Sequence, residues 1–418
     1  MLLKGDLPKV EPIISVGLVL PEDKQNSIVI TNSKSKKTLS FKVNGDYISV
    51  NNKIIKENYF LNNNDGQNFN LDRIPVGRGF HWSRDISVDI TGDLLVKNVN
   101  GYLFIINRIK LEKYLACVAT SEMSSRCPIA LLEAQTIAAR SWILAADEQK
   151  HSNLNIDACN DDCCQRYQGI NNLTNLAYKA ASNTRGYVLT HQNKICDTRY
   201  SKSCGGISEA NENVWFDKPK PYLRSISDNI EEKVPNLNSE QQLLNWFNKP
   251  KTCFCDTREM GPNKLKSYLG NVDLKGSYFR WEYSINQDKL CKLINVKLEG
   301  SFEKINSLEA IDRGSSGRII KLKINGTVLR EPFHKIIKSE YEIRRTLHPK
   351  FLYSSAFIII PHINLKSSPT HFTFKGAGWG HGVGLCQIGA LNMALDNYSS
   401  NKILFHYFQN TKLKKIYD

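Results

Sequence analysis

Glu122 stands where one helical pattern ends and another begins. It lies in the run Ala119-Thr-Ser-Glu-Met123, and the next helix opens at Pro128, where the missing N–H costs nothing. A carboxyl group at such a junction can be shielded from water, which favours its protonated form. A protonated carboxyl can donate its proton to a glycosidic oxygen, so this position predicts a general acid. The alternative is a solvated glutamate near a helix end.

A glycine-rich run late in the chain carries a tryptophan and a histidine. It reads Gly376-Ala-Gly-Trp-Gly-His-Gly-Val-Gly384, with five glycines in nine positions. Trp379 offers a ring for sugar stacking, and His381 adds a titratable group beside it. The run is neither a dinucleotide fingerprint nor a phosphate loop, because the βαβ context and a following Lys-Ser/Thr pair are missing. The alternative is a structural turn.

A third segment combines hydroxyl groups with a glycine pair. It reads Tyr200-Ser-Lys-Ser-Cys-Gly-Gly206 and is followed by Trp215, which is typical of the lip of a ligand cleft. Cys204 could act as a nucleophile with His381 as its base. A buried thiol is the commoner state of a cysteine, so we favour that alternative.

A cysteine-rich turn contains metal-ligand residue types. Three thiols fall within six residues, and His151 or Asp157 could supply a fourth donor to a tetrahedral zinc site. A disulfide and free thiols remain alternatives, since the eleven cysteines are an odd number and the spacing is not that of a CxxC pair. Elsewhere, Cys253 and Cys255 are too close for a mutual disulfide, and Cys386 lies among apolar residues that indicate core packing.

The elements that must position these residues follow a mixed pattern. Short strand-like runs separated by turn signals extend to about residue 107. We expect strands at 13–20, 27–31, 38–43, 47–53, 86–90 and 102–106, and a loop over the Asn-rich stretch 51–70. The pattern becomes helical at Leu111, and a second helix follows Pro128 with small residues along one face.

The remainder alternates helices and strands. We expect helices at about 173–183, 241–248, 287–293, 339–346 and 387–394 and a last one around Ile403 to Phe408. We expect strands at 187–191, 197–200, 278–284, 318–324 and 356–360. The fold class is therefore α+β. The expected organisation is a β-rich portion 1–108, a first catalytic part 109–228, an accessory region 229–340 and a second catalytic part 341–418.

Composition excludes several classes of protein. The chain has 418 residues, of which 41% are hydrophobic and 23% charged, and this excludes a disordered or fibrous protein. The net charge of +15 favours an anionic partner. The basic residues are spread without aromatic interleaving, so no nucleic acid is expected. No apolar run is long enough to cross a membrane, and no signal sequence is visible at the amino terminus.

Several blocks together resemble the stage II sporulation protein D family, which includes the LytB-type amidase enhancers. The blocks keep the family's order over about residues 111–410, whereas 1–100 and 229–340 match only loosely. They are Leu111 to Met123, Pro128 to Trp142, Cys164 to Gly169, Tyr200 to Gly206, Pro221 to Leu223, Glu342 to Arg345 and the glycine-rich run.

The resemblance implies a lytic transglycosylase acting on peptidoglycan glycan strands that lack stem peptides. Glu122 occupies the position of the family's acid/base glutamate, which protonates the glycosidic oxygen and later accepts a proton as the muramic C6 hydroxyl closes a 1,6-anhydro ring. One carboxyl group suffices, because the substrate supplies the nucleophile. The cleft is expected between Glu122 and the glycine-rich run. The residues expected to line it are Gln135, Arg140, Tyr200, Ser203, Trp379, His381 and Gln387.

The resemblance also implies a cofactor, partners and a location. Some family members carry zinc just before the Cys-Gln block, which implies a structural zinc and no organic cofactor. Its ligands would be His151, Cys159, Cys163 and Cys164. The expected partners are peptidoglycan glycan strands and a cell-wall amidase, and the expected location is the cell envelope. The rival function is a non-catalytic wall-binding factor that activates an amidase.

Overall fold

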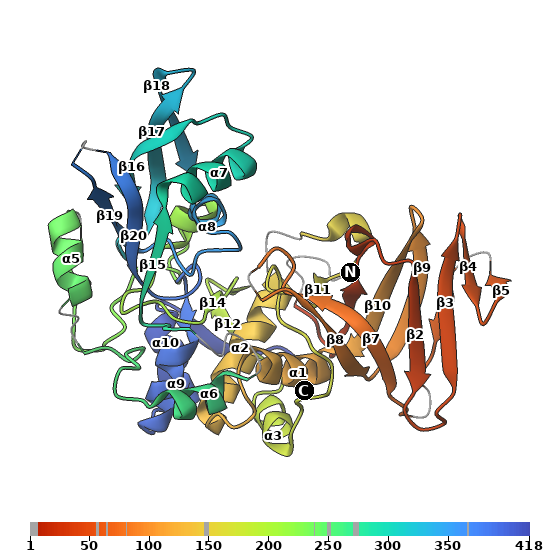
Figure 1. The fold of residues 1–418 in the computed structure, drawn as a ribbon. Helices are drawn as coiled ribbons and strands as arrows, with labels where there is room; N and C mark the ends of the chain where they lie inside the picture. The colour runs from red at the N-terminus through yellow and green to blue at the C-terminus, as the bar shows by residue number, and fades with distance from the viewer. Residues whose placement is uncertain are drawn as a thin grey trace. The chain divides into compact units, whose positions relative to one another are not determined.

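The structure is a computed structural model of the chain. It describes residues 7–418 apart from 56–57, 64–65, 81, 146–149, 238, 249–251, 271–275 and 366–367. Helices and strands both contribute substantially, and strands dominate the first 110 residues (Figure 1). The α+β class with a β-rich amino-terminal portion is therefore confirmed.

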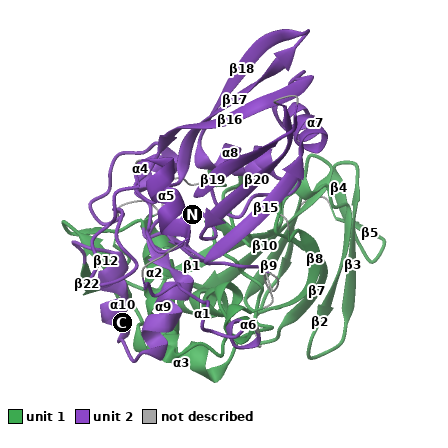
Figure 2. Ribbon diagram, turned by 60° about the vertical axis from the view of Figure 1, so that its left-hand side comes forward, with its two compact units in different colours: residues 1–197, 266–273, 412–418 green, residues 198–265, 274–411 purple. Residues whose placement is uncertain are grey.

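The chain forms two compact units, each built from separate segments (Figure 2). Unit 1 comprises Met1–Asp197, Lys266–Asp273 and Lys412–Asp418. Unit 2 comprises Thr198–Leu265 and Leu274–Thr411. Among the predicted site residues, Glu122, Gln135, Arg140 and the expected zinc ligands belong to unit 1, and the others belong to unit 2.

Two sheets make up the β-rich part of unit 1. The six-stranded sheet has the order β5-β4-β3-β2-β7-β8, and the five-stranded sheet has the order β11-β1-β10-β9-β6. The strands are β1 (Ile13–Val19), β2 (Ser27–Asn32), β3 (Thr38–Asn44), β4 (Tyr47–Val50), β5 (Lys53–Ile55), β6 (Tyr59–Leu61), β7 (Phe69–Val76), β8 (Arg84–Ile90), β9 (Asp93–Val99), β10 (Tyr102–Lys110) and β11 (Ala158–Cys159).

The burial pattern explains why these segments form strands. In β2, Ile28 and Ile30 are buried while Val29 between them is 43% exposed, as expected for a sheet with one face in solvent. In β10, by contrast, Leu103 to Ile106 are buried consecutively, so both faces of this central strand are covered. The short 3-10 helix η1 (Pro21–Asp23) connects β1 to β2.

Three helices follow the sheets in unit 1. They are α1 (Leu111–Glu122), α2 (Ile129–Ala145) and α3 (Asn175–Asn183), which pack against one another. Buried alanines of α2, among them Ala134 and Ala138, allow this close approach. Between α2 and α3 lies the 3-10 helix η2 (Ser152–Leu154), and a small sheet then follows with the order β13 (Lys194–Ile195), β12 (Tyr187–His191), β22 (Lys412–Lys415).

Unit 2 contains two three-stranded sheets and a short parallel pair. The first sheet has the order β15 (Arg280–Asn286), β20 (Pro369–Ala377), β19 (Phe357–Ile363), and the second β16 (Lys304–Arg313), β17 (Ile319–Val328), β18 (Glu331–Lys338). β14 (Tyr200–Ser201) pairs in parallel with β21 (Leu385–Cys386). One apolar core joins these two sheets to α7 (Gln287–Leu298) and α8 (Glu340–Leu347).

The remaining helices are short. They are α4 (Asn211–Trp215), α5 (Glu240–Asn248), α6 (Pro262–Leu269), α9 (Gln387–Leu395) and α10 (Ser400–Tyr407). No helix in the described part of the chain is both long enough and apolar enough to span a bilayer.

Most predicted elements are confirmed, and three predictions are wrong. The strand expected at 47–53 is a hairpin, because β4 ends at Val50 and the chain turns at residues 51–52 into β5. The Asn-rich stretch 51–70 is not one loop, because β5, β6 and the start of β7 fall within it; residues 56–57 and 64–65 lie outside the described residues. The strand expected at 197–200 is limited to Tyr200, which begins β14. Arg199, just before β14, still bonds to the partner strand, since Leu385 N–H of β21 donates to Arg199 O at 2.9 Å.

Candidate functional site

Glu122 is the last residue of α1, and it is only 7% exposed. The expected junction is present, because α1 ends here and α2 begins at Ile129. One carboxylate oxygen, Oε1, accepts a hydrogen bond from the backbone N–H of Arg166 at 3.0 Å. A buried carboxyl group held by a backbone donor has a defined orientation.

The segment 165–168, which follows the cysteine-rich turn, bonds to both helices around Glu122. Gln168 N–H donates to Ser121 Oγ at 3.1 Å. Gln165 accepts from Tyr114 Oη on α1 at 3.1 Å and donates through Nε2 to Ala139 O on α2, also at 3.1 Å. The backbone that contacts Glu122 is thus fixed to the same helices that carry the glutamate.

Arg166 and its partners are functional candidates that the sequence did not indicate. Its guanidinium bonds to Asp162 and lies 4.5 Å from the centre of the Trp82 ring. Trp82 Nε1 also donates to the Asp162 carboxylate at 3.0 Å. The three side chains therefore immobilise the residue whose N–H reaches Glu122. Trp82 is 84 positions away from Arg166, and no local pattern could have linked them.

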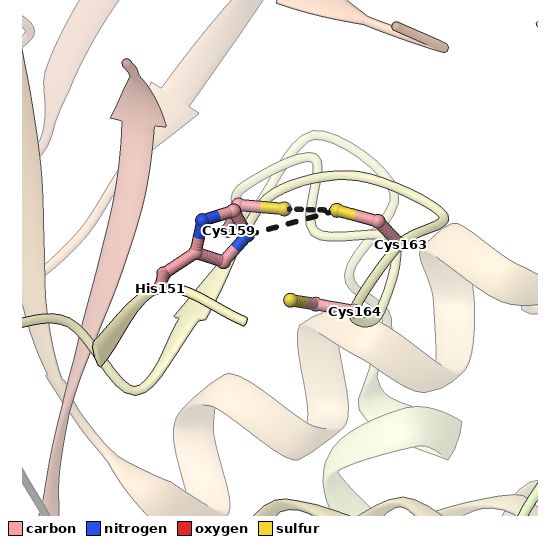
Figure 3. A group of neighbouring side chains, drawn as sticks. All are labelled: His151, Cys159, Cys163 and Cys164. Atoms are coloured by element: carbon pink, nitrogen blue, oxygen red, sulfur yellow. Dashed lines mark hydrogen bonds between the residues drawn. The ribbon is translucent and has the colours of Figure 1, made fainter. Parts of the chain in front are cut away.

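The four expected zinc ligands come together in the structure. His151, Cys159, Cys163 and Cys164 face one another, and their ligand atoms all lie within 4.8 Å of each other (Figure 3). Cys159 Sγ is 3.0 Å from Cys163 Sγ, and His151 Nε2 is 3.7 Å from Cys163 Sγ. Asp157, the alternative fourth donor, instead accepts a hydrogen bond from Ser15 N–H at 2.8 Å.

The donor set of this group suits a metal ion. All eleven cysteines are free, and a sulfur–sulfur distance of 3.0 Å is far longer than a disulfide bond of about 2.05 Å. Three sulfurs and one imidazole are a typical zinc donor set. Hydrogen bonds from Cys159 and Cys164, with a further contribution from His151, hold the pKa of the Cys163 thiol below its ordinary value. The group could therefore hold a metal ion.

The cysteine-rich turn is anchored to the β-rich part of unit 1 through Asp161. Its carboxylate accepts backbone N–H groups from Gly77 at 2.8 Å and from Arg78 at 2.7 Å. The guanidinium of Arg78 in turn bonds to Asp23 and Asn160. Burial raises the pKa of Asp161, with the charge of Asp162 acting in the same direction. The turn is thus fixed to the β-rich part of unit 1 as well as to the helices.

Gln135 and Arg140 are completely buried in α2. The guanidinium of Arg140 bonds to the carboxylate of Glu112 through Nε at 2.9 Å and through Nη2, and it donates to Tyr187 O at 2.9 Å. These contacts give Arg140 a structural role between α1, α2 and β12.

Two glycines of the glycine-rich run in unit 2 are in close contact with other residues of unit 2. A Cβ on Gly382 would lie 2.3 Å from the Arg318 guanidinium carbon, and a Cβ on Gly384 would lie 2.1 Å from Arg199 O; both residues have positive φ. Arg318 is 1% exposed and donates to Cys204 O at 3.3 Å. At these two positions glycine is needed for the backbone conformation and the close packing of the turn.

Trp379 and His381 have different surroundings. Trp379 is 8% exposed, and its ring stacks on Tyr353 with centroids 4.3 Å apart. His381 is half-buried, accepts Val383 N–H on Nδ1 at 3.0 Å and contacts the Trp215 ring edge-on at 5.0 Å. Because Nδ1 accepts, a neutral His381 ring carries its proton on Nε2. We call the pair of His381 and Trp215 the Trp215 surface.

The other predicted residues of unit 2 lie on the strands and turns next to this run. Tyr200 is half-buried in β14, opposite Leu385 of β21. Ser203 is buried and exchanges backbone hydrogen bonds with Trp379, at 3.1 and 2.7 Å. Gln387 is 1% exposed at the first turn of α9. The structure therefore brings Tyr200, Ser203, Trp379, His381 and Gln387 into one neighbourhood of unit 2.

A separate cavity in unit 2 contains none of the predicted residues. It has a volume of about 780 Å³ and lies between segment 225–234 and α10. His406 on α10 lines it, and burial lowers the pKa of that imidazole to about 4.

Family models match two parts of the chain. Residues 99–191 match the model described as stage II sporulation protein, and this segment includes Glu122 and the group at His151. Residues 209–384 match a model described as a domain of unknown function (DUF8618).

Individual relatives point the same way. The chain is 25% identical over 326 residues to an uncharacterized protein of Brachyspira hyodysenteriae, covering 78% of this chain and 72% of that protein. It is 26% identical over 309 residues to the amidase enhancer of Bacillus subtilis, covering 71% of this chain but only 39% of the enhancer. It is 23% identical over 328 residues to stage II sporulation protein D of the same organism, covering 74% and 76%. The resemblance seen in the sequence is confirmed.

Proposed function

We propose that this relative of the stage II sporulation protein D and amidase enhancer family is a peptidoglycan lytic transglycosylase of the cell envelope. Its substrate would be glycan strands without stem peptides, cleaved between N-acetylmuramic acid and N-acetylglucosamine to leave 1,6-anhydro ends. The observation that carries the proposal is the buried carboxyl group of Glu122. It lies inside the segment that matches the family model and is oriented by Arg166 N–H.

The chemistry needs one acid/base group from the protein. Glu122, protonated, donates its proton to the glycosidic oxygen as the bond from that oxygen to muramic C1 breaks. The carboxylate then accepts the proton of the muramic C6 hydroxyl as that oxygen bonds to C1. Glu122 thus ends the reaction with a proton, as it began, and no water is consumed. A second protein carboxylate is unnecessary because the nucleophile belongs to the substrate.

The group at His151 fits a structural zinc ion in this proposal. His151, Cys159, Cys163 and Cys164 would hold it, and the ion would supply cross-linking of the cysteine-rich turn. The turn continues directly into segment 165–168, whose backbone bonds to Glu122 and Ser121. Holding this turn rigid would therefore keep the carboxyl group of Glu122 in its orientation.

Within unit 2 taken by itself, two of the predicted residues are accessible for contact with sugar. Tyr200 and His381 are half-buried, and His381 belongs to the Trp215 surface, where aromatic rings suit the apolar faces of sugars. Gln135, Arg140, Ser203, Trp379 and Gln387 are buried and would position their neighbours.

The proposal is tested with Glu122→Gln, which removes the acid without changing the shape of the side chain. Peptide-free glycan strands are incubated with each protein, and the products are analysed by mass spectrometry. We expect anhydro-ended fragments from the unchanged chain and at least a 10²-fold lower rate from the variant, because general acid catalysis contributes about that much. The variant should still bind glycan.

The matched control is Glu133→Gln on α2. Glu133 is partly exposed and accepts a hydrogen bond from Asn183, so its loss should leave turnover unchanged. Fragments with ordinary reducing ends would mean hydrolysis and would remove the ring-closing step. Strands left intact by the folded, metal-loaded chain would refute the lytic activity.

The name of one relative supports a second candidate, an enhancer of a cell-wall amidase. This function needs binding to the wall or to the amidase but no proton transfer. Amidase release of stem peptides from whole peptidoglycan is therefore measured with and without the chain. Stimulation that survives Glu122→Gln supports the enhancer, whereas stimulation that disappears with the glutamate favours the lyase.

A further inference from the structure

A second group of metal-ligand side chains lies in unit 2. It consists of Cys204, Asp228, Cys255 and Cys386, whose ligand atoms all lie within 4.8 Å of one another. All four residues are buried, with exposures of 3% or less. They come from four separate segments: the turn after β14, the loop at 228, the segment between α5 and α6, and the end of β21. Folding of unit 2 is what brings them together.

The spacing of the sulfurs suits a shared metal ion. Cys204 Sγ lies 3.7 Å from Cys255 Sγ. In a tetrahedral zinc site with zinc–sulfur bonds of about 2.3 Å, two ligand sulfurs lie about 3.8 Å apart. A disulfide would place them at about 2.05 Å, and both cysteines are free.

The carboxylate of Asp228 is oriented by two donors. Tyr407 Oη donates to Oδ1 at 2.6 Å, and Cys255 N–H donates to Oδ2 at 2.6 Å. Tyr407 is itself only 2% exposed. Carboxylates that bind metals are commonly held by outer hydrogen bonds of this kind, which fix the direction in which the ligand oxygen points.

The sulfur of Cys386 accepts two backbone hydrogen bonds. It caps the amino terminus of α9, where Gly389 N–H points at it from 3.4 Å. Cys204 N–H points at the same sulfur from 3.2 Å. Backbone donors at a helix amino terminus stabilise negative charge on sulfur, and a thiolate is the metal-binding form.

We propose that Cys204, Cys255, Cys386 and Asp228 bind one zinc ion that stabilises unit 2, separately from the group at His151. Buried thiolates and a buried carboxylate are costly when bare, and a divalent cation offsets that cost. Three sulfurs and one carboxylate oxygen are accepted zinc ligands in a closed, structural site. Cys204 is then a ligand rather than a nucleophile for His381.

The test counts zinc per chain by native mass spectrometry after purification without chelator. The unchanged protein should carry two zinc ions. Cys204→Ser with Cys386→Ser should carry one, and Cys159→Ser with Cys163→Ser should also carry one. The matched control is Cys291→Ser, which removes a buried thiol of unit 2 outside the group and should leave the count at two.

Because the substituted chains could fail to fold, a second measurement uses the unchanged chain. The unchanged chain is loaded with cadmium-113, and its NMR spectrum should contain two resonances, one from each group. A single resonance that disappears with the Cys159 and Cys163 substitutions would overturn the proposal, as would one zinc per chain that is lost with the same pair. Peptide mapping that finds Cys204 disulfide-bonded to Cys255 would also overturn it. Loss of lytic activity has no bearing on these readouts, so the two proposals fail independently.

Discussion

At the scale of single residues, the guanidinium of Arg140 illustrates how a buried charge is accommodated. It is matched by the carboxylate of Glu112, and Glu112 also accepts a hydrogen bond from Tyr417 Oη at 2.6 Å. Burying such a pair has an unfavourable free energy of desolvation. Removing one partner destabilises the fold further, because the remaining charge is then buried without a counter-charge.

We therefore expect Glu112→Gln to lower the free energy of unfolding by about 3–5 kcal/mol. Arg140 would remain in the core without a counter-charge. Urea unfolding followed by tryptophan fluorescence measures the loss. The control Glu133→Gln, at a partly exposed position of α2, should change stability by less than about 0.5 kcal/mol. A loss of that small size for Glu112→Gln would show that the pair is not structural.

The sequence indicates residues well when their neighbours are close in the chain. Glu122 was identified from a helix junction, and three of the four ligands near His151 lie within six positions. The group at Asp228 could not be found in this way, since its consecutive members are separated by 24 to 131 residues. Cys386 was expected to pack in the core, and it is buried, but its role depends on partners that only the tertiary structure supplies.

At the scale of elements, α10 carries a titratable group on its inner side. His406 contacts the ring of Phe254 at 5.7 Å, and its Nε2 has no hydrogen-bond partner in the described residues. Burial lowers the pKa of this imidazole from 6.5 to about 4. The neutral form is therefore favoured in the folded state.

This shift makes stability depend on pH. Above pH 6.5 His406 is neutral in both the folded and the unfolded chain, so protonation does not reduce the free energy of unfolding. Between pH 6.5 and about 4, the unfolded chain binds a proton at this residue and the folded chain does not. We expect the protein to lose up to about 3 kcal/mol across this window. His406→Phe should remove that part of the pH dependence in denaturant titrations, and an unchanged slope would contradict the assignment.

Elements whose apolar residues recur at regular spacing could be predicted from the sequence. The mostly exposed strand β18 and the very short strands β5 and β6 could not. Helix α1 and strand β2 repeat apolar residues at helical and strand spacing, and β10 contains a continuous apolar run around Leu103. β18 was missed because most of its residues are exposed, so it has little apolar alternation. β5 and β6 have only three residues each within an Asn-rich stretch, and pairing with β4 and β9 defines them.

At the scale of the whole molecule, the chain leaves unit 1 after residue 197 and returns to it. The last returning segment forms β22, which pairs with β12 from Tyr187 to Thr190. Tyr417 beyond it is 5% exposed and bonds to Glu112. No local pattern could predict this pairing, because it joins residues more than 220 positions apart.

Deletion of residues 412–418 should therefore destabilise unit 1 although it removes no predicted site residue. Losing the buried Tyr417 ring alone should cost about 3–5 kcal/mol. Hydrogen exchange should become faster in β12 and α2, whereas β16 and β17 of unit 2 should keep their protection. Tyr417→Phe, which keeps the ring, should produce a much smaller effect. Equal loss of protection in both units would contradict the division of the chain described above.

The pairing of β22 with β12 also affects synthesis on the ribosome. Domains usually fold in the order in which they emerge. Here the whole of unit 2 is translated between β13 and β22. The edge of β12 that pairs with β22 therefore has no partner strand until β22 has been made. An open strand edge is a template for wrong pairing with other nascent chains. The chain is thus expected to depend on chaperones until β22 has been made.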